Sequence, residues 1–435
     1  MKQFYAIKRE AYENKILKYA GNKNIIFMMG ARHCGKTCIA MNLEEELKKI
    51  CKKDEIVARF NFETADANML KVGKMFEVFK KHYKKGRKMY ILLDEVTRIQ
   101  EWYEAVNYMN EFPECKLFIF SSNTGVLSNR LNAVREGTYN IIHVLPLSFE
   151  EFILFQEFKE ITPAETEITK KRYLGPNDKE YTIQEVFGIY ITYGGLPIMR
   201  PEHLDRERAR VVLDGTYSSI VVRDIMEADK IGNESSITDP VILRHVITIL
   251  SNSIGNNISA TWVKKYMAEK TGKRSATKTV EMYMRALLSS HLFYMSERYD
   301  IRTDKKLKTL AKYYVVDAGI HNYLVGIEEE KKKILENKVF FELMRRDYEV
   351  LNGKIGNQKI DLVAVKGKRK IYIQVAYEFD SETLKDYLSS LRKVRDNHLK
   401  VLISFRNESC VTTDGIIILN ALEFLMGQPL IRYGV

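Results

Sequence analysis

Short apolar runs alternate with amphipathic stretches over about the first 150 residues of the chain. Five of these runs are candidate strands, at residues 25–29, 56–62, 89–93, 116–120 and 141–145. Amphipathic segments with helical spacing lie between them, at residues 38–50, 70–83 and 102–108. Continuous apolar runs are typical of strands buried on both faces, and their alternation with helices predicts a parallel sheet. The pattern therefore predicts an α/β domain that ends near residue 160.

The segment between the first apolar run and the first amphipathic stretch reads Gly-Ala-Arg-His-Cys-Gly-Lys-Thr, residues 30–37. It fits the phosphate-binding pattern Gly-x-x-x-x-Gly-Lys-[Ser/Thr] at every fixed position, and its place between strand and helix argues against a glycine-rich turn that matches by chance. We expect Lys36 to contact the β- and γ-phosphates of a nucleotide and Thr37 to ligate magnesium. The residues expected to surround the phosphates are Gly30, Ala31, Arg32, His33, Cys34, Gly35, Lys36, Thr37 and Cys38.

Two adjacent carboxylates, Asp94 and Glu95, follow the apolar run at residues 90–93. In phosphate-loop enzymes an acid at the end of a strand beside the loop holds magnesium, and we expect Asp94 in that role, directly or through water. Glu95 is placed to polarise the attacking water, which predicts hydrolysis of ATP as well as binding. A pair of solvent-facing acids at a strand end is the alternative.

A polar segment, residues 121–125, ends the strand predicted at residues 116–120. Ser122 or Asn123 would there touch the γ-phosphate or its attacking water, so both are candidate catalytic residues beside Glu95 and Lys36. Serine and asparagine are also ordinary turn formers. The first part of the chain thus predicts an ATPase site with ATP and Mg²⁺ as its ligands.

The pattern changes beyond residue 160. Residues 161–181 are polar, and we interpret them as an insertion or a flexible connector. Three predicted helices follow, at residues 241–252, 260–269 and 276–288. Two strand-like pieces, at residues 291–295 and 313–317, then flank a basic hairpin segment at residues 298–312. This order is typical of a winged helix, which lays its last helix in the major groove of DNA. A winged helix that serves only as a packing module is the alternative.

The formal net charge of +12 favours a polyanionic partner, and DNA is the natural candidate. Lysines on solvated helix faces are the alternative source of this charge. The basic side chains at the leading edge of the third predicted helix are Lys270, Lys273, Arg274 and Lys278.

The bulk properties bear on compartment as well. No apolar run approaches the roughly 20 residues that span a bilayer, and the N-terminus lacks the apolar core of a secretory signal. The five scattered cysteines fit a reducing compartment and no structural zinc. We therefore expect a cytoplasmic protein without a membrane partner, divided into roughly three domains.

In this order the motifs resemble those of prokaryotic AAA-type ATPases that carry a C-terminal domain of uncharacterised function. In the phosphate loop Arg32 matches the family and His33 replaces a second arginine. The other matching segments are residues 92–95 followed by Trp102, residues 145–152 with the Pro-Leu-Ser signature, the turn at 193–197, residues 223–225 and residues 316–319.

The resemblance implies a phosphate-loop parallel sheet, then a winged helix and a small α/β module like that of restriction endonucleases. The expected regions are an ATPase core at 1–160, a connector and lid-like helical region at 161–236, a winged helix at 237–330 and the α/β module at 331–435. In the last region we predict helices at 335–346 and 381–394 and strands at 348–350, 360–365, 370–375 and 400–404.

Two departures from the family limit what the resemblance carries over. Arg130 and Arg135 are both candidates for touching the γ-phosphate of a neighbouring subunit, and surface ion pairs are the alternative for each. In the nuclease-like module Glu342, Asp361 and Gln374 fit metal-binding positions, but Ala376 stands where a lysine should activate water. We therefore expect a scaffold or a DNA-binding role, with Lys338 and then Lys359 as candidates for a relocated lysine.

Three functions follow from these features. The first is an ATPase whose nucleotide state controls a winged helix that binds DNA or another partner. An ATP-regulated, magnesium-dependent nuclease and a binding protein that ATP orders without turnover are the alternatives. Glu95 favours the first over the third, Ala376 favours it over the second, and a homo-oligomer or a protein partner stays open.

Overall fold

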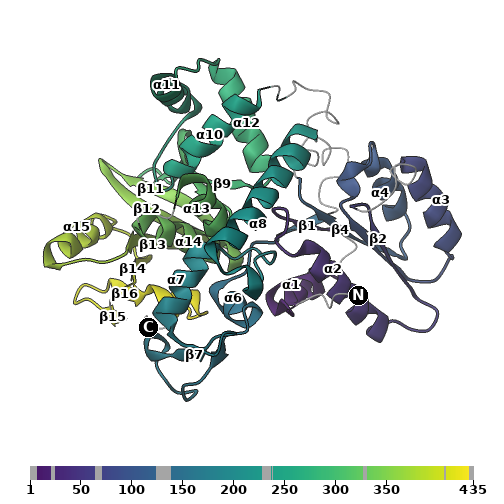
Figure 1. The fold of residues 1–435 in the computed structure, drawn as a ribbon, viewed down its shortest axis with the longest axis horizontal. Coiled ribbons are helices and arrows are strands. Elements are labelled where there is room, and N and C mark those ends of the chain that lie inside the picture. The colour runs from purple at the N-terminus through teal and green to yellow at the C-terminus, as the bar shows by residue number, and fades with distance from the viewer. Residues whose placement is uncertain are drawn as a thin grey trace. The chain divides into compact units, whose positions relative to one another are not determined.

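The computed structural model describes eight segments of the chain and divides into two compact units (Figure 1). The described segments are residues 7–20, 25–63, 71–123, 139–227, 237, 239–326, 331–405 and 408–430. Unit 1 comprises Met1–Pro146, Gly215–Thr238 and Ser289–Leu292, and unit 2 comprises Leu147–Asp214, Asp239–Leu288 and Phe293–Val435. Within the described segments, no helix is long and apolar enough to cross a membrane.

Unit 1 contains a five-stranded sheet in the order β2-β3-β4-β1-β5, and every neighbouring pair is parallel. Its strands are β1 (Ile25–Met29), β2 (Ile56–Asn61), β3 (Met89–Asp94), β4 (Cys115–Ser121) and β5 (Tyr139–His143). The apolar runs in the sequence therefore identified all five strands, although β5 ends two residues earlier than expected. This strand order is typical of phosphate-loop NTPases, which confirms the fold class for this part of the chain.

Four α-helices that lie wholly within the described residues of unit 1 accompany this sheet (Figure 1). They are α1 (Glu10–Ala20), α2 (Lys36–Ile50), α3 (Val72–His82) and α4 (Trp102–Asn110), and a short 3-10 turn, η1 (Val96–Arg98), follows β3. Trp102 is fully buried in one apolar cluster with Phe27, Met75 and Ile119. The cluster packs helix residues against β1, β3 and β4.

Unit 2 contains an eight-stranded mixed sheet in the order β10-β9-β11-β12-β13-β14-β16-β15. Its strands are β9 (Phe293–Asp300), β10 (Lys305–Val315), β11 (Glu349–Ile355), β12 (Gln358–Lys366), β13 (Arg369–Ala376), β14 (Leu399–Ser404), β15 (Cys410–Val411) and β16 (Ile417–Asn420). Strand β11 pairs in parallel with β9, with Asn352 opposite Arg298. The sheet thus runs across residue 330, where the sequence placed the boundary between winged helix and α/β module; the division into regions stays a prediction.

The helices of unit 2 lie before, between and after these strands in the sequence. They are α6 (Phe149–Phe155), α7 (Ile183–Tyr193), α8 (Arg206–Ser219, whose end belongs to unit 1), α10 (Pro240–Asn252), α11 (Ala260–Thr271), α12 (Thr277–Ser289), α13 (Ala318–Val325), α14 (Lys331–Arg345), α15 (Ser381–Arg392) and α16 (Ala421–Leu425), with 3-10 turns η3 (Ile168–Lys170) and η4 (Pro201–His203). The predicted N-cap at Ser148 is confirmed, because its side chain and Glu151 form a capping box at the start of α6.

One expectation for unit 2 was wrong in part, and another was confirmed. Residues 161–181 are not a flexible connector, since β6 (Lys159–Glu160), β7 (Arg172–Leu174) and β8 (Glu180–Thr182) form a small antiparallel sheet that buries Tyr173. The alternative for this segment, an insertion, stays open. The hairpin expected at residues 298–312 is confirmed, because β9 and β10 are antiparallel and pair over most of their length, with one register shift between Leu307 and Ala311. In the small sheet charged side chains lie at exposed strand positions, which made its composition resemble that of a loop.

Candidate nucleotide site

The phosphate loop lies between β1 and α2, and its backbone has an unusual conformation. Gly30 lies so close to β5's end that a Cβ there would sit 2.0 Å from the Val144 carbonyl oxygen. Gly35 has φ 96° and His33 has φ 64°, both in the left-handed region. Gly35 is the N-cap of α2 and supplies no side-chain cap, so the first N–H groups of the helix are left for an anion.

Lys36 is buried at the centre of the loop. Its Nζ donates to the carbonyl oxygens of Gly30 and Ala31, each at 3.0 Å, and lies 3.7 Å from Oε1 of Glu95. Burial by itself lowers the pKa of Lys36, but Cys34 and the Glu95 carboxylate raise it by more, and the net pKa is raised. The ammonium therefore stays charged next to the loop.

Asp94 ends β3 and is only 1% exposed, which rules out the solvent-facing alternative for this residue. Neither of its carboxylate oxygens accepts a well-aligned hydrogen bond from the described residues, although the Thr37 hydroxyl lies close by. Burial raises the pKa of Asp94, and the Thr37 hydroxyl and the Lys36 ammonium partly offset that effect. A buried carboxylate with so little hydrogen bonding is costly, and a hard divalent cation is the partner that carboxylate and hydroxyl oxygens suit. Asp94 and Thr37 therefore fit magnesium.

Glu95 follows Asp94 in a left-handed conformation, with φ 54° and ψ 38°. Its Oε2 accepts hydrogen bonds from the backbone N–H and the hydroxyl of Ser122, each at 3.1 Å. Burial raises the pKa of Glu95, and Lys36 opposes the rise. A non-glycine residue held in this conformation stores backbone strain, which proteins tolerate mostly at functional sites. The structure thus places Lys36, Glu95 and Ser122 together, as the sequence predicted.

Asp224 lies in the same cluster, although the sequence analysis gave it no role. It belongs to η5 (Ile220–Glu227), a π-helical segment that continues α8. Its carboxylate accepts three hydrogen bonds from the Arg32 guanidinium, at 2.6, 3.1 and 3.3 Å. The Ser122 hydroxyl lies 3.2 Å from the Asp224 carboxylate and 3.1 Å from that of Glu95, and its one proton is shared between the two. The Asp224 carbonyl oxygen accepts from Nδ2 of Asn123 at 2.6 Å. The only signal in the sequence was that residues 223–225 match the family.

Glu63, which follows β2, binds one arginine of the phosphate loop and one of η5. Its Oε1 accepts from Arg32 at 2.8 Å and from Arg223, beside Asp224, at 2.9 Å. Burial raises the pKa of Glu63, but Arg32 and the other nearby arginines lower it by more. Arg32 thus lies between two carboxylates, both from segments that the sequence analysis left outside the site.

Arg9 of the segment before α1 holds the loop from its other side. It is buried, and its guanidinium donates to the carbonyl oxygens of Cys34 and Leu145 at 3.0 Å and of Pro146 at 3.3 Å. One cation therefore satisfies carbonyl groups from the phosphate loop and from the chain after β5. Residues Arg130 and Arg135, proposed to reach a neighbouring subunit, lie outside the described residues.

The nuclease-like positions in unit 2 do not come together as expected. Glu342 binds Arg345 and Arg346, which follow it in the chain, at 2.7 and 2.8 Å. The α14 acid near Asp361 is instead Glu336, six residues earlier, because both contact the same ammonium group, that of Lys312. The choice of Glu342 was wrong because α14 is buried over most of its length, so the burial pattern does not show which glutamate faces β12.

Lysines occupy the space around Glu336 and Asp361. Nζ of Lys312, on β10, lies 2.8 Å from Glu336 and 3.8 Å from Oδ1 of Asp361, and Nζ of Lys332 lies 3.5 Å from Oδ2. Gln374 is engaged by its protein neighbours, since its Oε1 accepts from the Asp361 N–H at 3.3 Å. No three His, Cys, Asp or Glu side chains within the described segments are grouped to hold a metal.

The candidates for a relocated lysine were also wrong. Lys338 lies over the Tyr190 ring at 3.6 Å, and burial lowers its pKa to about 8. The Lys359 side chain is exposed, and its carbonyl oxygen accepts from Gln374. Ala376 is fully buried in an apolar cluster of the sheet, away from any charged role.

Two more of the segments that resemble the AAA-type family contact each other in unit 2. Asp317, the N-cap of α13, accepts from the N–H of Gly195 at 2.6 Å and from that of Gly319 at 2.9 Å. Gly194 has φ 83°, and a Cβ there would sit 2.0 Å from the Asp317 carboxylate. The turn at 193–197 and the segment at 316–319 therefore contact each other through Asp317.

Residues 22–153 match the family described as "AAA domain", and residues 184–331 match "Domain of unknown function (DUF8612)". A protein of Haemophilus influenzae described as "Uncharacterized protein" is 28% identical over 97% of this chain and 98% of its own length. The protein MJ1544 of Methanocaldococcus jannaschii, also described as uncharacterized, is 26% identical over 90% of this chain and 84% of its own.

Solved structures show only a distant likeness. The Holliday junction branch migration motor RuvB of Thermotoga maritima is 14% identical, with TM-score 0.32 over 67% of this chain and 90% of its own. AMPPCP-bound DnaA of Aquifex aeolicus is 15% identical, with TM-score 0.24 over 64% and 87%. The family matches and the site geometry give the conclusion: the chain carries an AAA domain with a phosphate loop, followed by a domain of unknown function.

Proposed function

We propose that unit 1 binds ATP with magnesium and hydrolyses it, and that the nucleotide state controls DNA binding by unit 2. The observation that carries the first part is the buried carboxylate of Asp94, which accepts no well-aligned hydrogen bond, beside Thr37, Lys36 and the uncapped start of α2. These groups suit a divalent cation and an anion at adjacent positions. ATP with magnesium supplies both.

Each residue of the site has a role in this proposal. Lys36 and the first N–H groups of α2 bind the phosphates, and Asp94 and Thr37 hold the magnesium, which neutralises charge on the phosphates. Glu95 accepts a proton from the attacking water, a task for which a raised pKa suits a carboxylate. Because Glu95 now accepts from Ser122 and lies near Lys36, it must exchange these partners for water before turnover.

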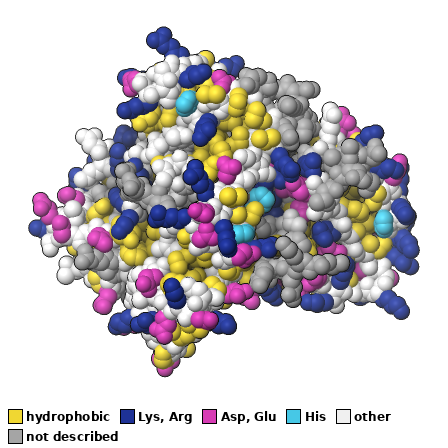
Figure 2. All heavy atoms as spheres, viewed as in Figure 1, with side chains coloured by type: hydrophobic (Ala, Val, Ile, Leu, Met, Phe, Trp, Pro, Cys, Tyr) yellow, Lys and Arg dark blue, Asp and Glu magenta, His cyan; other side chains and the backbone are white. Residues whose placement is uncertain are grey.

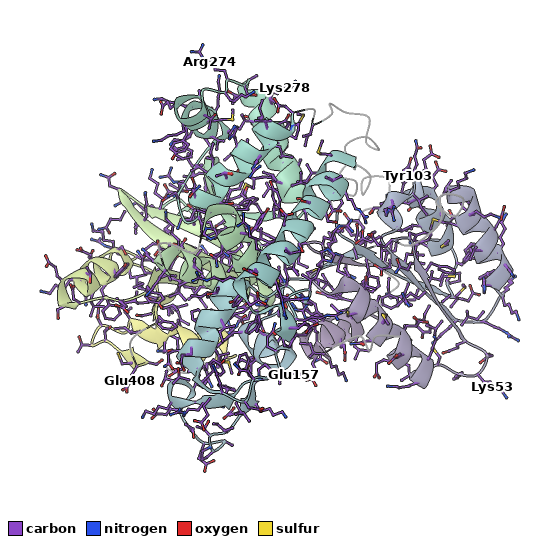
Figure 3. The ribbon with its side chains drawn as sticks, viewed as in Figure 1. Lys53, Tyr103, Glu157, Arg274, Lys278 and Glu408 are labelled. Carbon is purple, nitrogen blue, oxygen red and sulfur yellow. The ribbon has the colours of Figure 1, made fainter. Side chains whose placement is uncertain are left out.

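The DNA-binding part rests on the helices α10, α11 and α12 and the hairpin β9–β10. Ile258, in the short segment between α10 and α11, pairs with Ala311 of β10. The three helices, this short segment and the hairpin therefore occur in the order of a winged helix. Lys270, Lys273 and Arg274 are exposed at the end of α11 and in the loop after it. Figure 2 shows basic side chains around this end, and Figure 3 shows Arg274 and Lys278 projecting outward there. Exposed cations on one edge support contact with phosphates.

The same reasoning favours a scaffold or DNA-binding role for the large sheet over a nuclease. Lys312 supplies a cation between Glu336 and Asp361. Alanine at position 376 offers no proton-transfer group, and magnesium-dependent cleavage needs both a bound metal and an activated water.

The test is steady-state ATP hydrolysis by the purified chain with and without duplex DNA. We expect magnesium-dependent turnover that duplex DNA changes, and no turnover in Lys36→Ala, because this variant loses the cation that binds the phosphates. Lys48→Ala, an exposed lysine on α2, is the matched control. Equal residual turnover in the wild type and Lys36→Ala would refute the ATPase, and turnover insensitive to DNA would refute the coupling.

A further inference from the structure

Asp224 engages three donors that border the phosphate loop. The Arg32 guanidinium binds its carboxylate through both Nε and Nη2, the Ser122 hydroxyl adds a fourth hydrogen bond, and the Asn123 amide binds its carbonyl oxygen. All four residues are buried. Ser122 and Asn123 end β4 beside Glu95, and Arg32 is part of the loop, so these donors converge on one place in unit 1.

These donors form a site for an oxyanion, and Asp224 fills it. A guanidinium presents parallel N–H groups that fit a carboxylate and a phosphate equally well. A hydroxyl donor beside it suits either group. A triphosphate held by Lys36 and the start of α2 would bring its terminal phosphate to this neighbourhood, where a second anion repels it.

We propose that Asp224 is the residue by which the site distinguishes triphosphate from diphosphate, because its carboxylate occupies the donors that the terminal phosphate must take. This inference rests on the proposed function of unit 1. A nucleoside triphosphate displaces Asp224 from Arg32 and Ser122, whereas a diphosphate has no phosphate group there and leaves the contact intact. Asp224 is thus a positioning residue that acts through Arg32 and Ser122.

The segment that carries Asp224 suits such an exchange. η5 is π-helical, a conformation that is rare and less favourable than the α-helix that precedes it. It is held by Asp224 and by the ion pair between Arg223 and Glu63 at 2.9 Å. Because the one proton of the Ser122 hydroxyl is shared between Asp224 and Glu95, release of Asp224 leaves that proton to the water-polarising residue. η5 continues α8, whose first residues belong to unit 2. A displacement of η5 therefore leads along the covalent chain out of the nucleotide site.

The test compares Asp224→Asn with the wild type in binding a fluorescent non-hydrolysable ATP analogue and fluorescent ADP, both with magnesium. Asparagine keeps the shape and loses the charge. We expect the dissociation constant for the triphosphate to fall about tenfold, or about 1.4 kcal/mol, with that for ADP unchanged. The control is Asp205→Asn, an exposed acid before α8.

Unchanged or weaker triphosphate binding in Asp224→Asn would overturn the inference while leaving the ATPase in place. A wild type that binds neither nucleotide would overturn the proposed function itself. Hydrogen exchange of the wild type provides a second readout that needs no variant. We expect the amides of η5 to exchange faster with the triphosphate analogue than with ADP, and equal or slower exchange would contradict the displacement.

Discussion

Lys312 offers a sharp test of how unit 2 holds its buried acids. The side chains of Lys312 and Glu336 are 3% and 4% exposed, and that of Asp361 is 14% exposed. Removing one partner of a buried ion pair costs about 3–5 kcal/mol, since it leaves a charge without compensation. We therefore expect Lys312→Met to lower the free energy of unfolding of unit 2 by about that amount.

Lys332→Met is the matched control, because Lys332 also faces Asp361 but is 41% exposed. An exposed pair contributes about 0–1 kcal/mol, so this variant should lose no more than that. The double variant with Glu336→Gln separates ion pairing from general damage. We expect the double variant to lose less stability than the sum of the two single losses, by at least about 1 kcal/mol.

The pH dependence gives an independent check. Burial raises the pKa of Glu336, and Lys312 lowers it, so the folded-state pKa rises further in Lys312→Met. A carboxyl whose folded pKa lies above its unfolded pKa loses stability as the pH rises through that interval. The loss in Lys312→Met should therefore be larger at about pH 8 than at about pH 5.5.

The assay is urea unfolding followed by far-UV circular dichroism, with all variants made in a Trp262→Phe background so that the fluorescence of the buried Trp102 reports on unit 1. A transition of unit 1 that stays in place in all variants shows that the effect is confined to unit 2. Equal losses in Lys312→Met and Lys332→Met, or additive losses in the double variant, would refute the buried pair.

Three further predictions can be tested separately. Replacing Lys273, Arg274 and Lys278 with alanine should reduce the slope of log affinity against log salt for duplex DNA by up to about three units; an unchanged slope would leave these helices as a packing module. Purified protein should not nick supercoiled plasmid with magnesium or manganese, and nicking that disappears in Asp361→Ala would put the nuclease first. Because burial lowers the pKa of His291 well below its usual value, unit 1 should lose stability as the pH falls below about 6.5; His291→Gln should flatten that slope, and the same slope in both proteins would contradict this role.

The sequence predicted the features of unit 1 that depend on local pattern. The run before Gly30 is apolar because β1 lies between β4 and β5 and is buried on both faces. The phosphate loop is recognisable because its glycines meet backbone requirements that other residues fail. Asp94 and Glu95 were found because Asp94 ends a buried strand and Glu95 directly follows it.

Contacts between distant parts of the chain were not predictable from such patterns. Asp224 meets Arg32 across 192 residues, and nothing near Asp224 in the sequence marks it as a partner of the loop. Glu336 was missed for a different reason: α14 is buried around much of its circumference, so its two glutamates look alike in the sequence. The strands β6, β7 and β8 are two or three residues long, too short for an alternating pattern to show.

The most direct test of the central claim is Glu95→Gln, measured for ATP binding and for ATP turnover in the same preparation. Glutamine can keep the hydrogen bonds from Ser122 but cannot accept a proton from water. We expect magnesium-dependent ATP binding to persist, with turnover reduced by about 10²–10⁴-fold. Turnover equal to that of the wild type would contradict the account, since Glu95 would then be a structural residue.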